Sequence, residues 1–262
     1  MTAPGRSVPL HPSALRVIGA LVGRDLRRFF RQPSRVVGSV AQPLILWAIL
    51  GAGFADSFRA GTGGADYLAY FFPGTIVLAM LFTAIFSTMS VIDDRHHGFL
   101  QAVLVAPVSR PALVLGKTLG GVTIALVQAL AFIALSPLAG FSFAAMNLPL
   151  VIATLALAAV GFTALGFAVA WWIDSTQGYH GLMSVALIPL WMLSGAMFPA
   201  TGSQGWVRWL MRVDPMTYAV SAVRRGLVGG AGGGSVTIEV GVTALFALSA
   251  VVLAVGVCQR RA

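Results

Sequence analysis

The stretch PLVIATLALAAVGFTALGFAVAWW, residues 149–172, is apolar from end to end and contains no charged side chain. An α-helix needs about 20 such residues to cross the hydrocarbon core of a bilayer. The strands of membrane β-barrels alternate apolar and polar residues, so they do not give continuous apolar runs. This stretch therefore predicts a membrane-spanning helix.

Five further apolar segments have the same character. They lie near residues 36–56, 68–92, 118–140, 182–200 and 236–257. In the whole chain 58% of the residues are hydrophobic and only 10% are charged, whereas soluble domains carry about 25% charged residues. The sequence therefore predicts an all-α integral membrane protein with six transmembrane helices. It would consist of a cytoplasmic N-terminal segment, residues 1–35, and a transmembrane domain, residues 36–262.

The basic residues lie between the apolar segments, which suits topology signals better than a nucleic-acid-binding face. The net charge is +9, yet for this reason we expect no nucleic-acid partner. Most of the 17 lysines and arginines face the cytoplasm if both termini lie there, as the positive-inside rule favours. The arginines between the last two apolar segments fall on the outer side: Arg208, Arg212, Arg224 and Arg225.

Residues 14–35, ALRVIGALVGRDLRRFFRQPSR, predict an amphipathic helix that lies along the membrane surface. Apolar residues recur every three or four positions at Leu15, Ile18, Val22, Leu26 and Phe29. Arginines share the other side and would face anionic headgroups: Arg16, Arg24, Arg27, Arg28 and Arg31. Pro33 would end this helix. A basic flank that only sets the topology is the alternative.

Between the second and third apolar segments stands DDRHHGFLQAVLVAPVSRPALVLGK, residues 93–117. Asp93 or Asp94 can cap a short helix that runs from Arg95 to about Val105, and Pro107 would end it. Its apolar side chains could enter a groove on a partner: Phe99, Leu100, Val103 and Leu104. Packing of this loop against its own bundle is the alternative.

The tripeptide Gly116-Lys117-Thr118 in this stretch has the ending of a phosphate-binding P-loop. A P-loop would place its first glycine at position 111, where Pro111 offers no N–H. No strand leads into the segment either, so we expect no ATP site here. Gly116 and Gly120 form instead a small-residue pair suited to helix packing.

The neighbouring residues Asp93, Asp94, His96 and His97 combine carboxylates with imidazoles, which are metal ligands. The chain has only four histidines, so few other ligands could converge on this cluster. We favour a solvated, charged helix start and expect no metal site. Two alternatives stay open at this point: a membrane-embedded enzyme that uses this cluster, and a passive channel.

Residues 98–117 resemble the signature segment of type-2 ATP-binding-cassette (ABC) exporter permeases. The matching positions are Gly98, Leu100, Pro107, Ser109, Arg110, Gly116 and Lys117. A second segment, residues 193–225, resembles the late motif of the same family. Its matching positions are Gly195, Phe198, Pro199, Asp214, Pro215, Tyr218 and Arg224. Gln101 stands where the family usually carries a glutamate, so a salt bridge to the ATPase is not implied there.

The resemblance implies that two permease chains, identical or different, pair with two ATPase subunits. This chain would bind no cofactor and would not be an enzyme, because ATP and Mg²⁺ belong to the partner. Residues 93–106 would form the coupling helix that sits on the ATPase subunit. The residues implied in coupling are Arg95, Gly98, Phe99, Leu100, Gln101, Leu104, Pro107, Ser109 and Arg110.

The same resemblance implies that the first, second and fifth spanning helices flank a substrate route. Polar residues on them would line it: Gln42, Trp47, Thr83, Ser87, Ser90 and Ser194. Ordinary hydrogen bonding between helices is the alternative for each. Two short external re-entrant helices would follow the fifth span, the second capped by Asp214. They would form a gate with Phe198, Pro199, Asp214, Pro215, Tyr218 and Arg224.

Together these features predict the permease of an exporter in the bacterial inner membrane, surrounded by membrane lipids. Apolar walls with few fixed charges favour an amphipathic or lipid-like substrate over a small ion.

Overall fold

The computed structural model describes residues 14–62, 66–100, 105, 109–200, 203–229 and 235–260. Every regular element in these ranges is a helix. The helices are α1 (Ala14–Phe30), α2 (Pro33–Thr62), α3 (Tyr67–Ser87), α4 (Met89–His96), α6 (Arg110–Ala134), η1 (Ser136–Ala139), α7 (Leu148–Trp172), α8 (Thr176–Trp191), η2 (Met192–Ala196), α9 (Gly205–Val213), α10 (Pro215–Leu227) and α11 (Val236–Arg260).

Six helical stretches of the described chain are long and apolar enough to cross a membrane, which confirms the predicted number of spans. They cover Val36–Ser57, Tyr67–His96, Arg110–Ala134, Leu148–Trp172, Thr176–Ala196 and Val236–Arg260. The third span begins at Arg110, earlier than the predicted position near 118. Pro111 lies in its first turn, where a proline is favoured because backbone N–H groups have no partner inside the helix there. The fifth begins at Thr176, because the Ser175 side chain accepts a hydrogen bond from the Gly178 amide at 3.2 Å.

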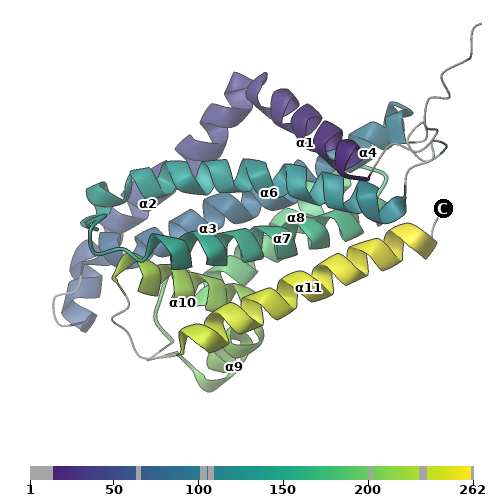
Figure 1. Cartoon of the computed structure of the whole chain (residues 1–262). Helices are drawn as coiled ribbons and strands as arrows, with labels where there is room; N and C mark the ends of the chain where they lie inside the picture. The colour runs from purple at the N-terminus through teal and green to yellow at the C-terminus, as the bar shows by residue number, and fades with distance from the viewer. Residues whose placement is uncertain are drawn as a thin grey trace, which may run out of the picture.

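Helices α3, α6 and α7 form the centre of the bundle (Figure 1). Phe71, Phe72, Phe162 and Phe167 are fully buried there, so α3 and α7 supply much of the core. α11 packs along α7 on one side, and α2 lies along α3 on another. Of the most apolar stretch of α2 only 11% is buried, against 72% for the span that begins with α3. The position of α2 therefore depends on few neighbours.

The corner between α9 and α10 is fixed by Asp214. Its carboxylate accepts a hydrogen bond from the Met216 amide at 2.9 Å, so it is the predicted N-cap of α10. The residue is 6% exposed. Burial raises the pKa of this carboxyl from 3.8 to about 7, although the hydrogen bonds from Met216 and Thr217 act in the opposite direction.

A buried ion pair holds α10 against α11. Arg225 donates to Glu239 in a bidentate arrangement, with nitrogen–oxygen distances of 2.9 and 3.1 Å, and both side chains are less than a tenth exposed. The Ser221 hydroxyl donates to the same carboxylate at 2.6 Å. Because a charge taken out of water is costly unless it is paired, this contact requires the two helices to dock together.

The raised pKa of Asp214 predicts a stability that falls as the pH rises. Between about pH 4 and pH 7 the folded protein holds a proton on Asp214 that the unfolded chain releases. Asp214→Asn keeps a neutral capping side chain and should remove this part of the pH dependence, as thermal unfolding in detergent can measure. Asp214→Ala, which removes the cap, should cost about 0.5–2 kcal/mol. Equal pH slopes for Asp214→Asn and the wild type would contradict the assignment.

The buried pair predicts that Glu239→Ala destabilises the protein by about 3–5 kcal/mol, because it removes the carboxylate from a buried arginine. Ser249→Ala on the exposed face of the same helix should change the unfolding free energy by less than about 0.5 kcal/mol. Thermal or chemical unfolding of the purified variants measures both. Similar effects of the two substitutions would show that the pair does not anchor α10.

Candidate functional site

Ion pairs join α1, α4 and α6 to one another. α1 and α4 lie at one end of the bundle (Figure 1). We call this cluster of ion pairs the charged junction. It consists of Arg24, Asp25, Arg28, Asp93, Asp94 and Lys117. Three basic and three acidic groups balance one another, so the cluster is neutral when all are ionised. It therefore needs no external counter-ion.

Lys117 lies at the centre of the charged junction and is 4% exposed. Its Nζ lies 2.6 Å from Asp94 Oδ2, 3.2 Å from Asp25 Oδ2 and 3.3 Å from Ser90 Oγ. An ammonium group has three N–H donors, and here each has an oxygen within reach. Because an unpaired buried ammonium is very costly, α6 can place Lys117 here only with α1 and α4 in position.

The arginines of α1 extend the charged junction towards the segment that follows α4. Arg24 donates to Asp94 through a very short contact, and Arg28 donates to Asp93 at 2.8 Å. The Arg24 guanidinium also lies over the Phe99 ring, with its central carbon 3.9 Å from the ring centroid. Such a stacked contact adds to the ionic ones. α1 thus touches both α4 and the residues after it.

This arrangement corrects the prediction for the aspartates. Asp93 and Asp94 do not cap a helix that starts at Arg95, because α4 runs over Met89–His96 and contains both. They are the ion-pair partners of α1 and α6. The helix ends at His96 with His97 as its C-cap, and Gly98 follows in the left-handed region with φ of 73°, a common helix stop.

The prediction for α1 also needs a correction. Arg24 and Arg28 bind carboxylates and do not face headgroups. Arg16 and Arg27 of the same helix are exposed, as is Arg31 directly after it. Of the predicted apolar side, Phe29 is buried but Leu15 is 81% exposed. The helix therefore uses a partly polar face to dock on the bundle.

Gly116 and Gly120 allow α1 to lie close to α6, as predicted for a packing pair. A Cβ atom at Gly116 would approach Leu21 Cδ1 to 2.7 Å, and one at Gly120 would lie 3.3 Å from Asp25 Oδ2. Asp25 can reach Lys117 because no side chain stands between the helices at this level. The Gly-Lys pair of the sequence motif therefore serves a helix contact.

Other predicted coupling residues lie around the end of α4. Arg95 reaches α7 and its following residues, donating to Trp171 O at 2.8 Å and to Asp174 Oδ1 at 2.5 Å. Leu100 is buried and Phe99 is half-buried. Ser109 precedes α6, and Arg110 donates to Gln259 O of α11 at 2.7 Å. Gln101, Leu104 and Pro107 lie outside the described residues.

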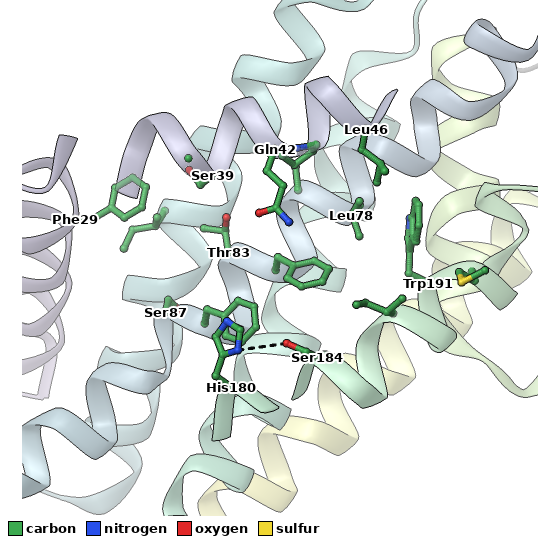
Figure 2. A pocket seen from close by; sticks show the side chains of 18 of the residues that line it. Phe29, Ser39, Gln42, Leu46, Leu78, Thr83, Ser87, His180, Ser184 and Trp191 are labelled. Atoms are coloured by element: carbon green, nitrogen blue, oxygen red, sulfur yellow. Dashed lines mark hydrogen bonds between the residues drawn. The ribbon is translucent and has the colours of Figure 1, made fainter. Parts of the chain in front are cut away.

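A cavity of about 620 Å³ lies between α2, α3 and α8, with Phe29 of α1 at one side (Figure 2). Its walls are largely apolar, with Leu46, Leu78 and Trp191 among them. None of the described residues that line it is an aspartate, glutamate, lysine or arginine. Polar groups come from hydroxyl, amide and imidazole side chains. These are Ser34, Ser39, Gln42, Thr83, Ser87, His180 and Ser184.

The structure brings together only some of the residues predicted for a substrate route. Gln42, Thr83 and Ser87 line the cavity. Trp47 instead donates to Leu68 O at 3.0 Å and tethers α2 to α3. Ser90 faces Lys117. Ser194 is buried and donates to Trp191 O at 2.6 Å.

Sequence reasoning missed His180 and Ser184. The His180 ring stacks on Phe86 with the centroids 4.6 Å apart, and it lies 3.5 Å from Ser184 Oγ (Figure 2). Gln128, also missed, links Thr83 to the Ser39 carbonyl through two very short contacts. A histidine early in an otherwise apolar span is a signal that could have pointed to this wall.

At the other end of α3, Arg224 holds the turn that ends α8. It donates to Gly195 O at 2.8 Å, and its guanidinium lies 4.3 Å from the Tyr70 ring centroid. Tyr70 donates to the same carbonyl at 2.9 Å. Gly195 has a φ of 76°, which a glycine adopts at little cost. Burial lowers the pKa of Arg224.

The remaining residues predicted for the gate lie around the same end. Tyr218 of α10 donates to Arg212 O at 2.8 Å, across the corner that Asp214 and Pro215 form between α9 and α10. Phe198 lines a small cavity of about 310 Å³ with Tyr67, and Pro199 is half-buried beside it.

Comparisons with known proteins agree with this architecture. The model of the ABC-2 type transporter family matches residues 16–228. The chain is similar to the daunorubicin resistance ABC transporter permease protein DrrB1 of Streptomyces coeruleorubidus, with 26% identity over 91% of this chain and 86% of the relative. It is also similar to nodulation protein J of Sinorhizobium fredii, with 23% identity over 86% of each chain.

The family match covers most of the chain. It contradicts two alternatives that the sequence left open, a membrane-embedded enzyme and a passive channel. ABC-2 permeases have no catalytic activity of their own and pair with separate ATPase subunits. The resemblance found in the two sequence motifs is thereby confirmed. This multi-pass integral membrane protein belongs to the ABC-2 type transporter family, as the permease subunit of an exporter.

Proposed function

We propose that this permease exports an amphipathic or lipid-like molecule through the cavity between α2, α3 and α8. The observation that carries the proposal is the lining of this cavity, which is apolar with scattered hydroxyl, amide and imidazole groups. Binding sites for organic molecules have this composition, since apolar walls supply affinity and a few polar groups set orientation. A small ion would lack the charged partners that it needs in a membrane.

The name of the Streptomyces relative, which speaks of daunorubicin resistance, suits such a cargo. The nodulation protein is named for a different process. We therefore propose only the chemical class of the cargo, an amphipathic or lipid-like molecule.

We infer an orientation with α1, α4 and the chain termini on the cytoplasmic side of a bacterial inner membrane. The end of the bundle that holds the charged junction carries most of the basic residues of α1 and α4, as the positive-inside rule favours. The segment 1–35 then precedes the transmembrane domain 36–262. α9 and α10 then lie outside as re-entrant helices, where arginines can sit at headgroup depth.

The segment that follows α4 is proposed to be the coupling helix that meets the ATPase subunit. It would include Gly98, Phe99, Leu100, Gln101, Leu104, Pro107, Ser109 and Arg110, with Arg95 holding its base against α7. ATP and Mg²⁺ would stay in the partner. Binding of ATP there would displace this segment relative to the bundle.

A second permease chain, identical or different, is proposed to complete the pathway. Apolar side chains of α2 and α8 would be available for this contact, because Ile45, Ile49, Leu182 and Val185 are all more than half exposed. Arg224 with Gly195 and Tyr70, together with Phe198, Pro199, Asp214, Pro215 and Tyr218, would close the outer end.

The proposal predicts that ATP changes access to the cavity. The reporter is Ser184→Cys in a Cys258→Ala background, in the complex with its ATPase subunit in lipid nanodiscs. A non-hydrolysable ATP analogue should change the rate of labelling by a maleimide dye at least about fivefold. Thr237→Cys, exposed in the first turn of α11 and not among the residues that line the cavity, is the matched control and should not respond.

The same reporter tests the cargo class. Daunorubicin or an alkyl glucoside should slow labelling of Ser184→Cys in the absence of nucleotide, whereas inorganic phosphate at equal concentration should not. An ATP-independent labelling rate, or protection by phosphate alone, would overturn the proposed function.

A further inference from the structure

The charged junction lies between the segment that follows α4 and the wall of the cavity. On one side, Arg24 stacks on Phe99 of that segment. On the other side, α1 ends at Phe30 beside Phe29, which lines the cavity, and α2 starts at Pro33. α2 then supplies Ser39 and Gln42 to the same wall. α1 thus contacts the segment that follows α4, here called the coupling segment, and continues directly into α2, which lines the cavity.

We propose that Lys117 is a positioning residue that makes α1 follow the coupling segment, so that a displacement received there is carried through α1 into α2. The inference rests on the proposed function, because it assigns the route between the ATPase contact and the cavity. In this proposal Gly116 and Lys117 of the sequence motif keep α1 attached to α6 while the coupling segment moves.

The contacts of Lys117 suit this role because they join two other helices at once. One donor points to Asp25 of α1, and the other two point to Asp94 and Ser90 of α4. If α1 moved away from α6, the ammonium would lose an ion pair inside the protein, where such a loss is costly. α1, α4 and the start of α6 should therefore move as one body.

α2 is the helix that such a movement would shift most easily. It is the least buried of the six spans, with 11% of its apolar stretch covered. Its described polar ties to the bundle include the bond from Trp47 to Leu68 O and the bond from Gln128 to Ser39 O. A helix with few buried residues can move at a lower cost than the helices of the core.

A removable covalent tie separates this role from simple stabilisation. A Cβ atom at Gly120 would lie 3.4 Å from the Cβ of Asp25, close to the roughly 3.5–4.5 Å found in disulfides. The test protein carries Asp25→Cys and Gly120→Cys in a Cys258→Ala background, since Cys258 is the only native cysteine. Reduced, it lacks the Asp25 ion pair. Oxidised, it joins α1 to α6 again without that charge.

The readout is the fluorine NMR resonance of fluorotryptophan at Trp47 of α2, assigned with Trp47→Phe, in the complex with the ATPase subunit. A non-hydrolysable ATP analogue should shift this resonance in the wild type. In the reduced double-cysteine protein the shift should fall to less than about one fifth, and oxidation should restore it. The single variants Asp25→Cys and Gly120→Cys cannot form the disulfide and should not respond to oxidation.

A second variant avoids a buried charge without a partner. Lys117→Met with Asp25→Leu replaces the pair by apolar side chains, which often leaves stability nearly unchanged. It should bind the ATPase subunit and still lose the ATP-dependent shift. An ATP-dependent shift of the Trp47 resonance as large as in the wild type, in this variant or in the reduced double-cysteine protein, would overturn the inference. An oxidised double-cysteine protein whose resonance does not shift would also overturn it. A wild type that gives no shift would likewise overturn the inference, because α2 would then not move with the nucleotide. The ATP dependence of Ser184→Cys labelling tests the proposed function separately.

Discussion

One buried ammonium group constrains the end of this permease where α1, α4 and α6 meet. Lys117 is nearly inaccessible to solvent and is held by carboxylates from two other helices. In an apolar bundle such a charge is tolerated only while its partners stay in place. The position of α1 against α6, the absence of side chains at Gly116 and Gly120, and the direction of α4 are therefore parts of a single arrangement.

The rest of the molecule can be understood as three levels along the spanning helices. The charged junction lies at the level where an ATPase subunit would act. The cavity in the middle has no aspartate, glutamate, lysine or arginine among its described lining residues, which suits a cargo that lipid also accepts. At the far level Arg224 and Tyr70 both donate to the Gly195 carbonyl of η2. Fixed charge is thus kept at the two ends and away from the cavity.

Much of the fold could be predicted from the sequence, because length and hydropathy alone define a spanning helix. The cap at Asp214 and the packing of Gly116 were also readable, since each follows from local spacing. The partner of Lys117 was not, because Asp25 lies 92 positions away and pairing at that distance leaves no local pattern. The same limit applies to His180, whose neighbour Phe86 belongs to another helix. The ends of α4 were misjudged because aspartates favour caps in general, whereas these two have arginines and a lysine within reach.

The central claim is that Lys117 and Asp25 bind α1 to the bundle as one energetic unit. A double-mutant cycle with Lys117→Met and Asp25→Leu measures it most directly, by unfolding the four proteins in the same detergent. The account predicts that each single substitution destabilises strongly and that the double variant recovers part of the loss, with a coupling energy of about 1–3 kcal/mol. Additive effects of the two substitutions would contradict it.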